Sequence, residues 1–163
     1  MKIYQVFISC CLLACSCKDD CPGILVKTHN SATGAHYTAI DSIVVKQDAQ
    51  RKEEIYMTSR RLYDNTVTLL FTSKSDYLNF QGTNTEGLPL VIHTGNHSYQ
   101  YPPGVYVAKK NMQFEESISY VLPLDTMSTI LKSRFEHGGQ FVIGENQLLI
   151  SDDVACGIKK LIK

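Results

Sequence analysis

Two histidines four residues apart, His93 and His97, are the first candidates for metal chemistry in this sequence. Histidines at this spacing share one face when they lie on a helix, where both can bind the same ion. Here Gly95-Asn96 separates them and predicts a two-residue β-hairpin turn instead. Thr94 then pairs with His97 and His93 pairs with Ser98, which puts the two imidazoles on opposite faces of the hairpin. We therefore expect no metal ion and no cofactor.

Motifs that mark common catalytic centres are absent from the sequence. It has no Gly-x-Ser-x-Gly nucleophile elbow, no His-Glu-x-x-His motif and no glycine-rich phosphate loop. The adjacent acids Glu53-Glu54 and Glu115-Glu116 point to opposite faces if they lie on strands, so neither pair forms a joint acid–base site. We favour a non-enzymatic role and keep a small envelope hydrolase with dispersed carboxylates as the enzymatic alternative.

Three tyrosines, Tyr99, Tyr101 and Tyr106, bracket the turn-forming segment Pro102-Pro103-Gly104. A tyrosine combines a large apolar ring with a polar hydroxyl and is frequent at recognition surfaces. Tyr99 and Tyr101 share a face if their strand is regular. We predict that these residues form a binding surface for a protein or a glycan. The alternative is that they only cover the edge of a small sheet.

Charge and composition limit the possible partners. The 163 residues include 16 basic and 16 acidic ones, so the chain is formally neutral. A domain without excess positive charge lacks the electrostatic attraction that nucleic acids require, and we expect no nucleic-acid partner. With 44% hydrophobic and 20% charged residues, the chain is typical of a globular protein with one core.

The first 16 residues are typical of a secretory signal peptide. Lys2 supplies the positive start, residues 6–14 form an apolar stretch, and Ala14 and Ser16 are small residues of the kind that precede a cleavage site. The apolar stretch is far shorter than the roughly 20 residues that a membrane-spanning helix needs. The alternative is a buried helix or strand, but the segment has neither periodicity.

The end of this leader resembles the signal of bacterial lipoproteins, in which a cysteine after a small residue is acylated and becomes the mature N-terminus. Two cysteines fit: Cys17, preceded by Leu13-Ala14-Cys15-Ser16, and Cys15, preceded by Leu12-Leu13-Ala14. We prefer Cys17, since cleavage there leaves an even number of further thiols. The resemblance implies a membrane anchor made of fatty acid, such as palmitate.

Lys18-Asp19-Asp20 follows directly and resembles the lysine-plus-acidic-pair signal that exports lipoproteins of the Bacteroidota to the outer face of their outer membrane. The resemblance implies a domain that faces the cell exterior on a lipidated tether of residues 17–22. The alternative is a plain solvated linker.

Cys21 and Cys156 are a candidate disulfide, because disulfides form and persist outside the cytoplasm. The bond would close a long loop and stabilise the fold by about 4–5 kcal/mol in the chain-entropy model. The alternative is two unpaired thiols, one in the tether and one buried.

Most of the remaining sequence has the composition and alternation of β-strands. We predict strands at residues 23–28, 37–46, 54–58, 66–72, 88–94, 97–100, 105–108 and 114–122, and a closing hairpin of residues 141–143 and 148–150. Residues 76–80 resemble a single helical turn, and residues 81–87 are typical of a loop.

Towards the end of the chain the hydrophobic period changes from two to about 3.6. A first helix follows Pro123, with Asp125 as its N-cap and Gly138 as its left-handed C-terminal residue. A second helix follows Ser151, although Gly157 inside it leaves a final strand as the alternative.

These patterns predict a signal peptide at residues 1–16, a tether at 17–22 and a single domain at 23–163. The predicted domain is α+β and mostly β, with an antiparallel sandwich- or barrel-like sheet and one or two C-terminal helices. We expect an outer-membrane lipoprotein that acts as a binding or envelope-assembly module, with its lipid in the membrane and an unknown protein or glycan as partner. The alternative function is an immunity or inhibitor lipoprotein that blocks a toxin or hydrolase.

Overall fold

The larger of two antiparallel sheets contains seven strands. The computed structural model describes residues 24, 26–30, 36–62, 64–82 and 86–162. The strands run in the order β1-β2-β4-β5-β9-β8, and β3 pairs with the first half of β4. Their bounds are β1 (Val26–Asn30), β2 (His36–Ile40), β3 (Ile43–Asp48), β4 (Glu53–Leu62), β5 (Thr66–Ser75), β8 (Tyr106–Lys110) and β9 (Phe114–Pro123).

The smaller sheet has four strands in the order β11-β10-β6-β7. Their bounds are β6 (Leu90–Thr94), β7 (His97–Tyr101), β10 (Gly139–Ile143) and β11 (Asn146–Leu149). Both hairpins of this sheet have two-residue turns, in which Gly95 at φ 54° and Gly144 at φ 59° adopt the left-handed backbone that such turns require. The predicted turn at residues 95–96 is confirmed, with Thr94 paired to His97.

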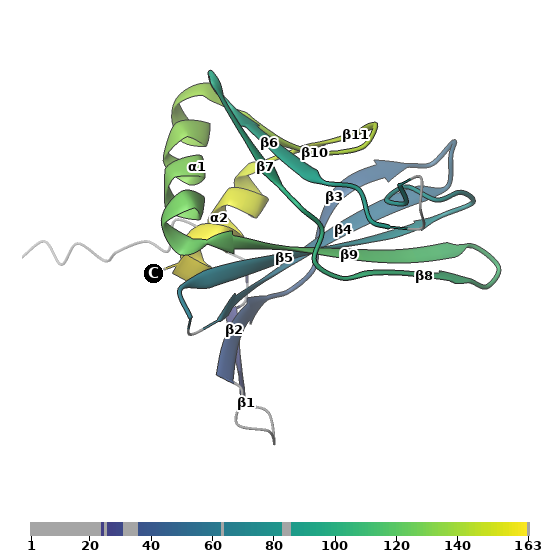
Figure 1. Ribbon diagram of the computed structural model, residues 1–163, viewed down its shortest axis with the longest axis horizontal. Coiled ribbons are helices and arrows are strands. Elements are labelled where there is room, and N and C mark those ends of the chain that lie inside the picture. The colour runs from purple at the N-terminus through teal and green to yellow at the C-terminus, as the bar shows by residue number, and fades with distance from the viewer. Residues whose placement is uncertain (1–23, 25, 31–35, 63, 83–85, 163) are drawn as a thin grey trace, which may run out of the picture.

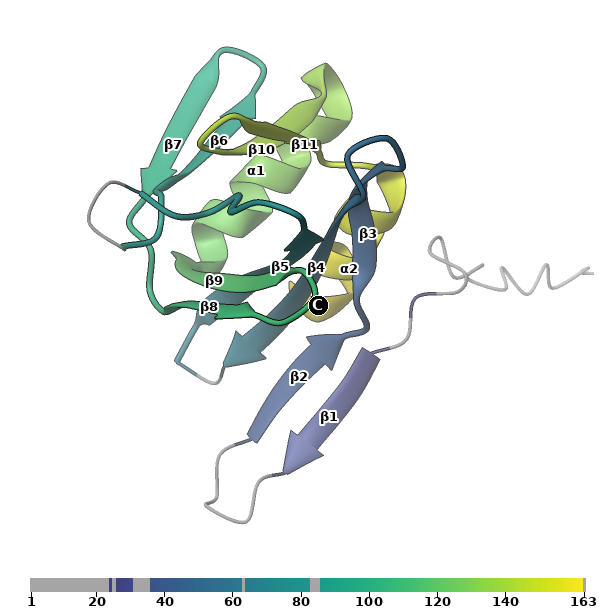
Figure 2. The same cartoon turned by 90° about the vertical axis from the view of Figure 1, so that its right-hand side faces the viewer.

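The two sheets face each other, and two helices lie at one end of the molecule (Figure 1). Helix α1 (Leu124–His137) contacts strands of both sheets, whereas α2 (Asp152–Ile162) packs on the β1 to β4 part of the larger sheet. Figure 2 shows that neither sheet closes on itself, with β1 and β8 at separate edges of the larger one. The predicted mostly β, α+β class is confirmed, and the architecture is sandwich-like rather than a closed barrel. Neither described helix has the length and apolar content to cross a bilayer.

A single apolar core fills the space between the sheets and helices. Phe71 on β5 contacts Tyr120 on β9 edge-on, with ring centroids 6.0 Å apart, and Phe141 on β10 of the smaller sheet at 5.6 Å. All three rings are fully buried. Burial of each such ring contributes about 1.5–3 kcal/mol, and the edge-on contacts add to this. This aromatic trio therefore joins the two sheets.

Helix α1 begins earlier than predicted. Its N-cap residue is Pro123, in extended conformation, and no side chain caps the helix, so the prediction of Asp125 as N-cap is wrong. Asp125 lies in the first turn instead, where a negative charge interacts favourably with the helix dipole. Gly138 adopts φ 78° and donates its N–H to the Arg134 carbonyl at 2.8 Å, which confirms its predicted position at the C-terminus.

The last segment of the described chain is a helix, and the alternative of a final strand is wrong. The Val154 N–H donates to the Ser151 hydroxyl at 3.3 Å, as expected of an N-cap. Gly157 lies on the buried face, where a Cβ atom would sit 2.6 Å from the Cδ1 atom of Ile40. Close packing against β2 therefore explains a glycine that helix propensity disfavours.

Two local predictions differ from the structure. The predicted strand at residues 37–46 is divided into β2 and β3. The predicted helical turn at residues 76–80 is wrong, because the N–H groups of Asn79 and Phe80 donate to the Glu116 carboxylate. A contact with a distant strand takes the place of local helical hydrogen bonds.

Candidate functional site

A surface groove lies between the β6–β7 hairpin and α1, and its volume is about 410 Å³. We call it the hairpin groove, and its lining residues are Gly95, Asn96, His97, Tyr99, Thr129, Lys132 and Ser133. Small-ligand sites in proteins typically occupy about 300–1,000 Å³. The groove therefore has the size of a small-ligand site, and it contains one of the predicted binding residues, Tyr99.

Helix α1 contributes one wall of the groove through its spacing. Thr129, Lys132 and Ser133 are three and four residues apart, which places them on one side of a helix. The core side of the same helix carries Met127, Ile130 and Leu131. Because these apolar residues fix the rotation of the helix against the sheets, Thr129, Lys132 and Ser133 lie on the side of the helix that lines the groove.

Strand β7 contributes the aromatic wall. His97 and Tyr99 are two residues apart on one face of the strand, and their rings are stacked, with centroids 6.4 Å apart and planes 20° apart. His93 pairs with Ser98 and therefore lies on the other face of the hairpin, as predicted. The two histidines are thus directed to different surfaces, and His97 belongs to the groove.

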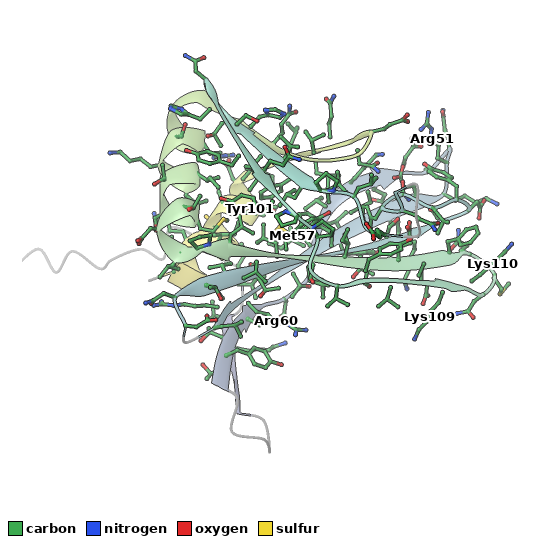
Figure 3. All side chains as sticks on the ribbon, in the orientation of Figure 1. Arg51, Met57, Arg60, Tyr101, Lys109 and Lys110 are labelled. Atoms are coloured by element: carbon green, nitrogen blue, oxygen red, sulfur yellow. The ribbon has the colours of Figure 1, made fainter. Side chains whose placement is uncertain are left out.

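The structure separates the three predicted tyrosines. Tyr99 and Tyr101 lie half-buried on the face of β7 that packs against the core. Figure 3 shows Tyr101 near the middle of the molecule, whereas Tyr106 lies on β8 of the other sheet. Tyr106 donates its hydroxyl to the buried Glu116 carboxylate at 2.8 Å. Burial, together with this hydrogen bond, raises the pKa of the Tyr106 hydroxyl well above its ordinary value.

Most tyrosine hydroxyls of the described chain have protein partners. Tyr56 donates to Glu54 at 2.6 Å, Tyr77 to Glu53 at 3.0 Å, and Tyr120 to a backbone carbonyl at 2.7 Å. Within the same part of the chain, the hydroxyls of Tyr99 and Tyr101 have no hydrogen-bond partner. Of these two half-buried phenols, Tyr99 lines the hairpin groove, so its hydroxyl is available for a ligand there.

A hydroxyl without a partner also lies next to the groove. Thr94, the residue before Gly95, is 1% exposed, and its side-chain oxygen has no hydrogen-bond partner in the described chain. It pairs with His97 across the hairpin and so shares the groove-side face of the β-ribbon. The hairpin thus places an unsatisfied polar atom close to the aromatic wall.

A buried polar cluster, which no motif in the sequence marks, lies elsewhere in the molecule. Glu116 is 1% exposed and accepts hydrogen bonds from the backbone N–H groups of Asn79 and Phe80 and from Tyr106. The Asn79 amide donates to Ser73 and Ser75 at 2.8 and 2.9 Å. The sequence signal for it is that Glu116 falls on the same face of β9 as the buried residues Ile118 and Tyr120.

The same cluster continues to the neighbouring strands. Lys46 contacts the fully buried Glu53 carboxylate at 2.9 Å and donates to the Asn146 side-chain oxygen at 2.8 Å. The Asn146 amide in turn donates to the Asn79 side-chain oxygen at 3.3 Å. Because each group is held by protein partners, the cluster fits a structural role in fixing residues 76–80 over the sheet.

A second cavity, of about 360 Å³, lies beside the turn between β3 and β4. Its lining mixes acidic and basic side chains, including Asp48, Lys52, Glu54 and Lys74. Lys74 forms an exposed ion pair with Glu115 at 3.8 Å. Such balanced surface charge is typical of a solvated surface, so the hairpin groove is the better candidate site.

The predicted anchor residues, Cys17, the alternative Cys15 and Cys21, lie outside the described residues. Cys156 is half-buried in α2. The described chain begins beside the same helix, because Lys160 donates to the Ile24 carbonyl at 3.0 Å. Ile24, three positions after Cys21 in the sequence, therefore contacts the helix that carries Cys156.

No protein-family model, no curated protein and no solved structure matches this chain.

Proposed function

We propose that this protein is a lipoprotein of the bacterial outer membrane that acts as a non-enzymatic binding module and faces the cell exterior. The leader of residues 1–16, the acylated Cys17 and the charged tether that resembles a surface-export signal support this location. The hairpin groove is the proposed binding surface, and an envelope protein or glycan is the proposed partner. A disulfide between Cys21 and Cys156 holds the tether against α2.

The observation that carries the binding role is the contrast among the tyrosines. Tyr106 and Tyr120 use their hydroxyls to hold the protein together, whereas Tyr99 and Tyr101 keep theirs free of described partners. The buried acids Glu53 and Glu116 support a non-enzymatic role, since both are engaged by structural donors. The hydroxyl of Tyr99, which has no described partner, lies in the lining of the hairpin groove.

The binding role predicts that Tyr99→Ala reduces capture of the partner by about tenfold or more, because central tyrosines often dominate recognition. The measurement is a pull-down with the intact lipidated protein from its native envelope, with quantification of captured protein and glycan. Tyr56→Ala is the matched control, since Tyr56 is also half-buried but lies on β4 of the other sheet. Equal capture by the wild type and Tyr99→Ala would contradict the groove as binding surface. A captured toxin or hydrolase would favour the immunity alternative.

The anchor predicts that Cys17→Ser abolishes acylation and releases the protein from the membrane fraction, because the lipid supplies the attachment. Mass spectrometry of the native protein is expected to find a diacylglyceryl group on Cys17 as the first residue. Cys21→Ser is the control and is expected to keep the lipid. An unmodified N-terminal Met1, or acylation of Cys15, would contradict the proposed cleavage site.

A further inference from the structure

We propose that the hairpin groove binds an acidic saccharide, with the carboxylate of the sugar paired to Lys132 and the ring of the sugar against His97 and Tyr99. This inference rests on the proposed binding role of the groove and adds the chemistry of its ligand.

The positive charge of Lys132 favours a negatively charged ligand in the groove. Lys132 is the one charged residue in the described lining, and it is exposed. It forms no hydrogen bond or ion pair within the described chain, unlike Lys27, Lys46 and Lys74, which pair with carboxylates. None of the described lining residues is acidic, so Lys132 attracts a single carboxylate, sulfate or phosphate group.

The aromatic wall selects a flat ligand. The chain has no tryptophan, so a stacking surface has to be built from smaller rings. His97 and Tyr99 provide one, because both line the groove and their rings are stacked, with planes only 20° apart. The C–H face of a sugar ring is flat and apolar, with hydroxyls around its edge, and packs on an aromatic ring of such a wall.

The remaining lining groups select hydroxyls. The Asn96 amide both donates and accepts, and Ser133 and Tyr99 add hydroxyls. Thr129 already donates to the Asp125 carbonyl at 3.1 Å and so can only accept from a ligand. Several neutral donors and acceptors around one cation suit a sugar with many hydroxyls and one carboxylate. An acidic peptide is the competing ligand, because β7 is an edge strand of the smaller sheet whose backbone a peptide can pair with.

The test is calorimetric titration of the detergent-solubilised full-length protein with trisaccharides of galacturonic, glucuronic and mannuronic acid. Each is compared with its carboxyl-reduced, neutral counterpart. We expect at least one acid to bind about fivefold or more tightly than its neutral counterpart, as one exposed ion pair allows. Lys132→Met is expected to remove this difference between the acidic and the neutral sugar. Lys109→Met is the control, since Lys109 lies at the end of the molecule away from α1 (Figure 3).

Three results would overturn the inference: no acidic trisaccharide binds, acid and neutral forms bind equally, or a polyglutamate peptide competes for the groove where the sugars fail. The inference and the proposed function fail separately. If envelope capture depends on Tyr99 but is unchanged in Lys132→Met, the groove remains the binding surface and the acidic ligand is wrong.

Discussion

Replacing Glu116 with alanine is expected to lower the free energy of unfolding by about 3–5 kcal/mol, because two buried donors and one half-buried donor lose their acceptor. These donors are the N–H groups of Asn79 and Phe80 and the hydroxyl of Tyr106. Glu116 is 1% exposed, so water cannot easily take the place of its carboxylate. Urea denaturation followed by far-UV circular dichroism measures the change.

Two further variants make this prediction specific. Glu115→Ala alters the neighbouring acid, which is 46% exposed and pairs with Lys74 at 3.8 Å, and is expected to cost no more than about 1 kcal/mol. Glu116→Gln keeps the size of the side chain and one acceptor oxygen, and is expected to cost about 1–2 kcal/mol. Equal losses in Glu116→Ala and Glu115→Ala would show that the buried cluster does not hold residues 76–80.

Loss of the proposed Cys21–Cys156 disulfide is the second large effect, with an expected cost of about 4–5 kcal/mol from the entropy of the long loop. Chain connectivity supports the pairing, since three residues span at most about 10 Å and Ile24 contacts α2. A Cβ on Gly157, the residue after Cys156, would lie 3.7 Å from the Cγ2 atom of Ile24, so Ile24 packs against this part of α2.

A double-mutant cycle tests the pairing. Cys21→Ser and Cys156→Ser are each expected to destabilise by a similar amount, and the double variant by no more than either, because one bond is lost in every case. Cys21→Ser is the cleaner variant, since Cys156 is half-buried and its replacement also alters packing in α2. Alkylation of two thiols in the unreduced native protein, or additive losses in the double variant, would contradict the disulfide.

Features whose signal is local were predictable from the sequence. The alternation at residues 114–122 predicts β9 and its inward side chains, and the glycine-containing turn at residues 95–96 predicts the register of the β6–β7 hairpin. Ser151 predicts the start of α2. The period of a strand or helix and the backbone needs of a turn are properties of a few neighbouring residues, which is why these predictions are confirmed.

Contacts between distant segments were decided only by the tertiary structure. Nothing around residues 76–80 shows that their N–H groups meet Glu116, and so a helical turn was wrongly expected there. Nothing around Tyr99 shows that Lys132 of α1 lies across a groove from it. Periodicity specifies which face of an element is buried, but the packing of the whole core decides which distant element covers or borders that face.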